Sequence, residues 1–189
     1  MRIVAGKHRG RELQAPAGAA TRPTLGRARQ SLFDILQHGA FSTDGGSLLP
    51  GARVLEAFAG SGAFAFEALS RGAAFATLID NAKPAQAAIR ANAAALKETE
   101  NCRLIAGDAT RPPPADQACD LVFLDPPYGK DLIAPALAAL NAAGWIAPDA
   151  LVIVEAASDE AFAPPNGFDL LDERRYGPAK FIFLRFASK

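Results

Sequence analysis

The chain has 189 residues, a length that favours one domain, and half of them are hydrophobic, enough to build a full core. Its 20 basic and 20 acidic residues balance, so net charge alone indicates no class of partner. No stretch reaches the roughly 18 apolar residues of a membrane span, and the N-terminus has no hydrophobic signal core. We therefore expect a cytoplasmic protein without membrane contact.

The cysteine pattern argues against a metal site. Cys102 and Cys119 form no CxxC pair, and neither has a histidine nearby. Both lie in or beside apolar runs, where a buried free thiol is the ordinary outcome. We expect no bound metal.

Positive charge is concentrated at the N-terminus. Residues 1–30 hold seven Lys or Arg side chains and one acid, a net charge of +6, which leaves −6 for the rest of the chain. This asymmetry favours a surface that binds a polyanion, and a solubilising tail is the alternative. The side chains expected at that surface are Arg2, Lys7, His8, Arg9, Arg11, Arg22 and Arg27.

The first 40 residues predict a small extension. Residues 2–14 alternate around a basic turn bounded by glycines, as in a β-hairpin. Pro23 disfavours a helical Arg22, and Thr24 can cap a helix over residues 25–38. We therefore divide the chain into a basic hairpin and helix, residues 1–40, and a main domain, residues 41–189.

From residue 52 the chain alternates strands with helices. Strands are predicted at residues 52–57, 74–79, 102–106, 120–124 and 151–154. Helices are predicted up to about residue 70, over 83–98 and over 131–143, and a last hairpin at 168–174 and 180–186. This order predicts an α/β fold with a mostly parallel sheet. Such sheets bind ligands at the carboxyl ends of their strands, where Glu56, Asp80, Asp108 and Asp125 fall.

A glycine turn follows the first of these strands. Gly60 and Gly62 form G-x-G-x-x-A between a strand and a helix, where the backbone can approach a ligand closely. Asp80, 20 residues after Gly60, is placed to hold ribose hydroxyls. A dinucleotide enzyme and an S-adenosylmethionine enzyme both need this much, and a purely structural turn would also explain it.

Two acids favour S-adenosylmethionine. Glu56, just before the turn, would repel an anionic pyrophosphate but attract the sulfonium and ammonium cations of the methyl donor. Asp108 is positioned to reach the adenine end, although it could simply cap a turn.

The tetrapeptide Asp125-Pro126-Pro127-Tyr128 is the most specific motif in the chain. The prolines stiffen the loop and donate no hydrogen bond, so the Asp125 carboxylate and the Pro126 carbonyl are both acceptors. Two acceptors can hold the N–H groups of an exocyclic amine, free its lone pair and stabilise the cation that develops during methylation. Tyr128 can stack on the extruded base. This predicts a base amino methyltransferase, with a rigid capped turn as the alternative.

The chain resembles the RsmD family, bacterial 16S ribosomal RNA guanine-N2 methyltransferases. The similarity covers nearly the whole length. It is carried by residues 2–13, Thr21-Arg22-Pro23-Thr24, residues 58–62 and 67–73, Asn92, the tetrapeptide and Tyr176-Gly177. The chain departs from the family pattern at Glu56, where an aspartate is usual, at Leu25-Gly26 and at Gln30.

The resemblance implies a class I S-adenosylmethionine-dependent methyltransferase fold: Rossmann-like, with seven strands of which the last is antiparallel, plus an RNA-contacting N-terminal extension. We expect Asp125, Pro126 and Tyr128 to be catalytic. The expected cofactor-binding residues are Glu56, Phe58, Gly60, Gly62, Asp80, Asn81, Asp108 and Ala109. The expected partner is 16S ribosomal RNA, within an assembling small subunit, and the expected state is a monomer.

Three alternatives stay open at this point. The tetrapeptide also permits methylation of adenine N6 in nucleic acid or of a protein glutamine. The glycine turn permits a nicotinamide oxidoreductase, and the basic N-terminus permits a non-catalytic RNA-binding module.

Overall fold

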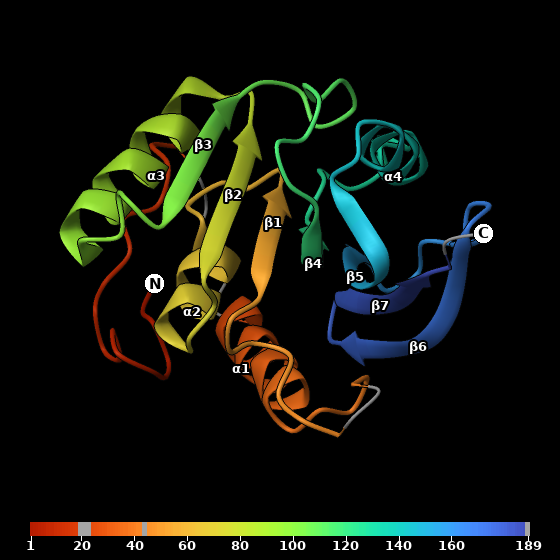
Figure 1. Cartoon of the computed structure of the whole chain (residues 1–189), viewed down its shortest axis with the longest axis horizontal. Helices are drawn as coiled ribbons and strands as arrows, with labels where there is room; N and C mark the ends of the chain where they lie inside the picture. The colour runs from red at the N-terminus through yellow and green to blue at the C-terminus, as the bar shows by residue number, and fades with distance from the viewer. Residues whose placement is uncertain (19–23, 43–44, 188–189) are drawn as a thin grey trace.

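A computed structural model describes residues 1–18, 24–42 and 45–187. It contains one seven-stranded sheet with helices on both faces (Figure 1). Within the described residues, no helix is both long enough and apolar enough to cross a membrane.

The strands follow the order β3-β2-β1-β4-β5-β7-β6 across the sheet. Every neighbouring pair from β3 to β5 is parallel, and β7 runs antiparallel to both β5 and β6. This confirms the expected fold class. The strands are β1 Arg53–Ala57, β2 Phe75–Asp80, β3 Cys102–Ala106, β4 Cys119–Leu124, β5 Ile146–Ala157, β6 Phe168–Tyr176 and β7 Ala179–Phe186.

The helices divide unequally between the two faces of the sheet. The side chains of successive strand residues point to opposite faces, so Val54 joins one hydrophobic core and Leu55 the other. One core contains residues of the first three helices, and the other contains residues of the fourth. The helices are α1 Thr24–Gln37, α2 Ala63–Ser70, α3 Lys83–Leu96 and α4 Ile133–Ala142.

Strand β5 begins earlier than the sequence pattern predicts. It starts at Ile146 and passes Pro148 and Asp149, and Asp149 has a φ of 59°. Its register with β4 jumps between the pairs Cys119–Ile146 and Leu121–Leu151. The bulge absorbs two residues that oppose strand structure, which hides this part of the strand in the sequence.

Residues 2–14 fold back on themselves without forming the two strands of a hairpin. Arg2 and Glu12 form one isolated antiparallel bridge, and the Ile3 amide donates to the Arg11 carbonyl at 3.0 Å. The next backbone donors turn to α2 instead. The amides of Val4 and Ala5 donate to the Glu67 carboxylate at 2.7 and 3.1 Å. The N-terminal segment therefore pairs with itself at Arg2 and Glu12, and Glu67 attaches it to the main domain.

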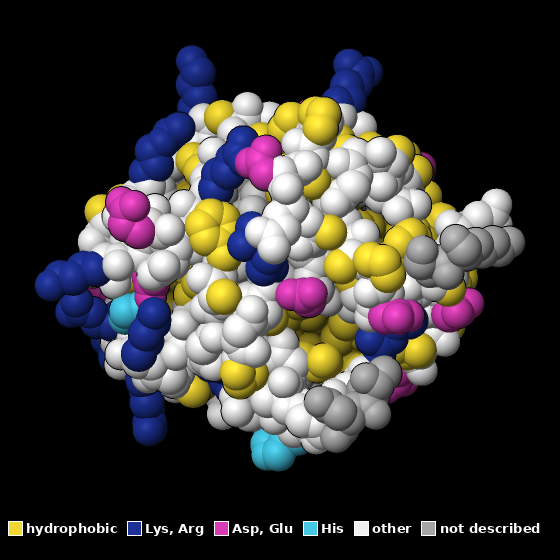
Figure 2. Space-filling model, viewed as in Figure 1, with side chains coloured by type: hydrophobic (Ala, Val, Ile, Leu, Met, Phe, Trp, Pro, Cys, Tyr) yellow, Lys and Arg dark blue, Asp and Glu magenta, His cyan; other side chains and the backbone are white. Residues whose placement is uncertain are grey.

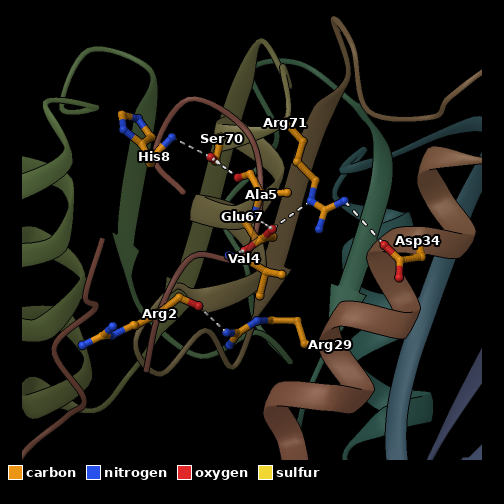
Figure 3. A network of polar contacts seen from close by, with 9 residues as sticks. All are labelled: Arg2, Val4, Ala5, His8, Arg29, Asp34, Glu67, Ser70 and Arg71. Atoms are coloured by element: carbon orange, nitrogen blue, oxygen red, sulfur yellow. Dashed lines mark hydrogen bonds and ion pairs between the residues drawn. The ribbon is translucent and has the colours of Figure 1, made fainter. Parts of the chain in front are cut away.

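Glu67 is the centre of this attachment (Figure 3). Its side chain is fully buried and also accepts a hydrogen bond from Arg71 Nε at 2.8 Å. Beside it, the Lys7 amide donates to the Ser70 carbonyl at 2.8 Å. Gly6 is needed there, because a Cβ at this position would lie 1.8 Å from the Ser70 carbonyl oxygen. Residues 3 and 13 consequently join the same core as α1, α2 and α3.

Replacing Glu67 with Gln should detach the N-terminal segment. The glutamine N–H₂ group cannot accept a hydrogen bond, so the amide of Val4 or Ala5 would lose its acceptor. Arg71 would also lose its buried anionic partner. Breaking such a pair lowers the free energy of unfolding by about 3–5 kcal/mol. Urea unfolding measures this loss, and hydrogen exchange should show faster exchange at the Val4 and Ala5 amides.

Glu12→Gln is the matched control, because Glu12 pairs with Arg2 on the exposed surface. It should leave the free energy of unfolding nearly unchanged, because solvent screens an exposed ion pair. Equal effects of the two substitutions would contradict the role assigned to Glu67.

Candidate active site

Two adjoining cavities lie at the carboxyl ends of the central strands. The larger has a volume of about 720 Å³ and is lined by Phe58, Asp80, Asn81, Asp108, Asp125, Pro126, Pro127, Tyr128, Leu132 and Glu155. The smaller, of about 140 Å³, continues past the glycine turn and includes Glu56 and Gly60. Phe58, Asp125 and Glu155 border both. The structure thus brings most of the expected site residues into one cleft.

The two glycines of the turn have different surroundings. Gly60, with a φ of 55°, has no atom within 4 Å of the position where a Cβ would stand, and it lines the smaller cavity. Gly62, with a φ of 75°, has side-chain atoms of Leu78 and Phe66 2.6 Å from that position. Gly62 therefore allows α2 to pack on β2, and it lines neither cavity. Ala109 also lines neither cavity and is buried.

Asp80 fixes the turn from the neighbouring strand. Its Oδ2 accepts the Gly60 amide at 2.8 Å, and its Oδ1 accepts the Ala82 amide at 2.8 Å. Phe58, at the start of the turn, has a φ of 58°, a left-handed conformation that is costly for an aromatic residue. Strain of this kind persists only where the surroundings impose it, here between the ends of β1 and β2.

Asp108 carries its charge at the rim of the larger cavity. Its Oδ1 accepts both the amide and the hydroxyl of Thr110 at 2.8 Å. These hydrogen bonds lower the pKa of the Asp108 carboxyl, which keeps it ionised.

Glu56 lies deeper, below the glycine turn. Its carboxylate accepts the amides of Phe64 at 3.2 Å and Ala65 at 2.9 Å, so it caps the N-terminus of α2. Burial raises its pKa to about 7, although both amides and the Arg29 charge act in the opposite direction. The structure therefore gives Glu56 a structural role that the sequence did not indicate. A direct role toward a cofactor stays a prediction.

The tetrapeptide follows β4 directly and is anchored at both ends. The Asp125 amide donates to the Ala57 carbonyl at 3.3 Å, which holds the end of β4 against β1. The Tyr128 hydroxyl donates to Glu155 Oε1 at 2.9 Å. Sequence reasoning missed Glu155. The available signal was a single acid within the apolar run of β5, where a buried charge needs a partner.

Arg29 is a second residue that sequence reasoning missed. It counted toward the basic charge but was not assigned to a site. It extends from α1 to the smaller cavity, beside Glu56 and Gly60. In the sequence, only its spacing from Leu32 and Phe33 on the buried face of the helix indicated that its side chain points toward the domain.

The residues expected to contact RNA differ in their surroundings. Arg2 pairs with Glu12 at 2.7 Å, and Lys7 and His8 both pair with the buried Glu98, at 2.7 and 2.5 Å. The His8 side chain thus points inward, which leaves its expected contact with phosphate a prediction. Arg9, Arg11 and Arg27 are exposed, and none of the ion pairs found among the described residues involves them. Arg22 lies outside the described residues.

Cationic side chains gather along the left edge of the face in Figure 2, where Figure 1 places the N-terminal segment and α3. Across the part of the chain that the structure describes, no group of three or more His, Cys, Asp or Glu side chains could hold a metal ion.

Comparison with known proteins decides the family. The family model described as conserved hypothetical protein 95 matches residues 1–185. The ribosomal RNA small subunit methyltransferase D of Haemophilus influenzae is 33% identical, over 94% of this chain and 89% of its own length. The chain belongs to the RsmD family. It is thus a member of a family of ribosomal RNA methyltransferases.

Solved structures agree with this assignment. The chain superposes on the methyltransferase-like protein yhhF from Escherichia coli with a TM-score of 0.81 and 31% identity, covering 100% of this chain and 99% of that one. SMU.776 was solved as a complex with SAH (S-adenosylhomocysteine). Its superposition has a TM-score of 0.59 at 17% identity and covers 83% of this chain and 49% of that one. The second likeness shows a shared fold.

The raised pKa of Glu56 should make folding stability depend on pH. In the unfolded chain this carboxyl loses its proton near 4.5, whereas the folded protein keeps it until about pH 7. Between these values the folded state binds more protons, so the free energy of unfolding falls as pH rises, by about 3 kcal/mol in total. Relative to the wild type, Glu56→Gln should therefore gain about 3 kcal/mol of stability between pH 4 and pH 8.

Urea unfolding of both proteins across this pH range, without ligand, measures the difference. Parallel stability curves would contradict the raised pKa.

Proposed function

We propose that this protein transfers a methyl group from S-adenosylmethionine to the exocyclic N2 of a guanine in 16S ribosomal RNA. The observation that carries the proposal is that Asp125, Pro126 and Tyr128 share one cleft with Asp80 and the glycine turn. A methyl donor held by the turn and an amine held by the tetrapeptide would therefore lie next to each other.

The charge of the cleft supports S-adenosylmethionine over a dinucleotide. Its two cavities are lined by five acids: Glu56, Asp80, Asp108, Asp125 and Glu155. Carboxylates repel a pyrophosphate and attract a sulfonium and an ammonium group. When bound, S-adenosylmethionine supplies an electrophilic methyl group.

The cofactor-binding roles follow the order of the strands. Asp80, with Asn81 beside it, would hold the ribose hydroxyls, and Asp108 would lie toward the adenine. Gly60 would let the backbone approach the donor, because nothing occupies the position of its missing Cβ. Gly62 and Ala109 would have indirect roles: Gly62 would shape the turn, and Ala109 would pack behind the cavity wall.

The tetrapeptide prepares the amine for methylation. The Asp125 carboxylate and the Pro126 carbonyl can accept the two N–H groups of an exocyclic amine, which frees its lone pair. The same acceptors stabilise the positive charge that develops on nitrogen. The ring of Tyr128 can stack on the base, and the hydrogen bond to Glu155 fixes that ring in advance.

Glu155 supports guanine as the base. Guanine presents an N1–H donor beside its N2 amine, whereas adenine presents an unprotonated N1 beside N6. A second carboxylate next to Asp125 suits two adjacent donors and would repel the acceptor of adenine. The names of the curated relatives support ribosomal RNA of the small subunit as the substrate.

The N-terminal extension supplies the proposed RNA surface. Residues 1–40 would act as an RNA-contacting extension on the catalytic domain formed by residues 41–189, with Arg9, Arg11 and Arg27 facing phosphates. We place the reaction on the RNA of an assembling small subunit in the cytoplasm, carried out by a monomer.

Asp125→Ala should strongly reduce the rate of methyl transfer. It removes an acceptor that acts most strongly in the transition state, and losses of this kind are about 10²- to 10³-fold in kcat. The measurement is incorporation of labelled methyl groups from S-adenosylmethionine into undermethylated small subunits, followed by identification of the modified nucleoside.

Asp169→Asn, an exposed acid on β6, is the control and should leave the rate unchanged. If wild-type protein leaves undermethylated subunits unlabelled, the proposal fails. Labelled N6-methyladenosine would assign the protein to the alternative amino methyltransferases, and labelled protein would indicate glutamine.

Removing Arg9 and Arg11 together should weaken RNA binding and reduce its dependence on salt. Each phosphate contact that is lost should make the slope of log K against log salt shallower by about 0.7 to 0.9. Fluorescence anisotropy with a 16S-derived RNA fragment measures both quantities. Arg103→Ala removes a charge that is paired with Asp116 on the sheet edge, and it should leave the slope unchanged. Equal slopes for the double variant and the wild type would exclude this segment from the RNA surface.

A further inference from the structure

The smaller cavity is lined by a partly buried cation that the reaction described above does not use. Arg29 lines this cavity together with Gly60, Ser61 and the shared border residues Asp125 and Glu155. The cavity therefore joins the glycine turn to the place where the target amine would bind, and one basic side chain reaches it from α1.

The guanidinium of Arg29 has fewer strong acceptors than it has nitrogens. Nη2 donates to the Arg2 carbonyl at 2.9 Å, as Figure 3 shows, and Nη1 contacts the Met1 thioether, a weak acceptor. Nε is buried and has no hydrogen-bond partner. Among the described residues, the ion pairs found do not include Arg29.

A guanidinium with a buried, unpartnered N–H costs free energy unless an acceptor completes its surroundings. Glu56 also lines this cavity, but its carboxylate oxygens accept amides of α2, and no ion pair between Glu56 and Arg29 is found among the described residues. An arginine fork is suited to a carboxylate, which it can bind through two parallel hydrogen bonds. The arrangement thus favours an anionic group that enters the cavity as part of a ligand.

We propose that Arg29 binds the α-carboxylate of the methyl donor, and that the acids bordering the cavity hold its α-ammonium. This assignment rests on the proposed function, because it takes the cofactor to be S-adenosylmethionine. It explains why one cation lies among acids in this cavity. The amino-acid end of the donor is a zwitterion, and a site that binds it needs both charges close together.

The test compares two ligands that differ in one group: S-adenosylhomocysteine and its decarboxylated analogue. Isothermal titration calorimetry gives the Kd of each for the wild type, for Arg29→Met and for Arg29→Lys. The wild type should prefer S-adenosylhomocysteine by about 10- to 100-fold, the size of one charged hydrogen-bonded contact. Arg29→Met should lose this preference and bind both ligands about equally. Arg29→Lys should keep part of it, because it retains the charge and loses the fork.

The analogue is an internal control for misfolding, since general damage to the cavity weakens both ligands alike. Arg90→Met, at an exposed position of α3, should keep the full preference. A preference that survives in Arg29→Met, or an equal loss of affinity for both ligands, would overturn the assignment. If neither ligand binds the wild type, the proposed cofactor itself is wrong, which is distinguishable from a wild type that binds both equally.

Discussion

The site depends on β1 being paired in parallel on both sides. Ala57, its last residue, lies opposite Ile79 of β2 and Leu124 of β4. Its carbonyl accepts the Asp125 amide, so the tetrapeptide must begin level with the glycine turn. On the other side, Asp80 accepts the Gly60 amide. The carboxyl ends of β2, β1 and β4 are therefore aligned at one edge of the sheet. The groups that would bind donor and acceptor follow these ends, so they lie close together.

Buried carboxylates attach the neighbouring parts to this frame. Glu56 caps α2 from below the turn, and Glu67 holds the N-terminal segment on the same helix. Burying a carboxylate costs free energy because its charge loses hydration, and this cost appears in the raised pKa of Glu56. The two carboxylates together fix the position of the short helix α2 between the cleft and the basic N-terminal segment.

The sequence was most informative where local patterns decide structure. The alternation of apolar runs predicted where the strands lie along the chain, and Gly60, Asp80 and the tetrapeptide predicted which strand ends line the cleft. It was least informative about contacts between distant segments. Glu155 and Arg29 reach the cleft from β5 and α1, and no local spacing connects those positions to the turn. The same reason explains why the attachment of residues 2–14 to α2 was not predicted, since Glu67 is about 60 residues away along the chain.

The central claim is methyl transfer to a guanine amino group of 16S ribosomal RNA. Mass-spectrometric mapping of modified nucleosides in 16S ribosomal RNA tests it most directly, in cells that lack the protein and in the same cells after the gene is restored. Our account predicts that one N2-methylguanosine is missing without the protein and returns with it. An unchanged set of modified nucleosides, or the loss of a methylated adenosine in its place, would contradict the account.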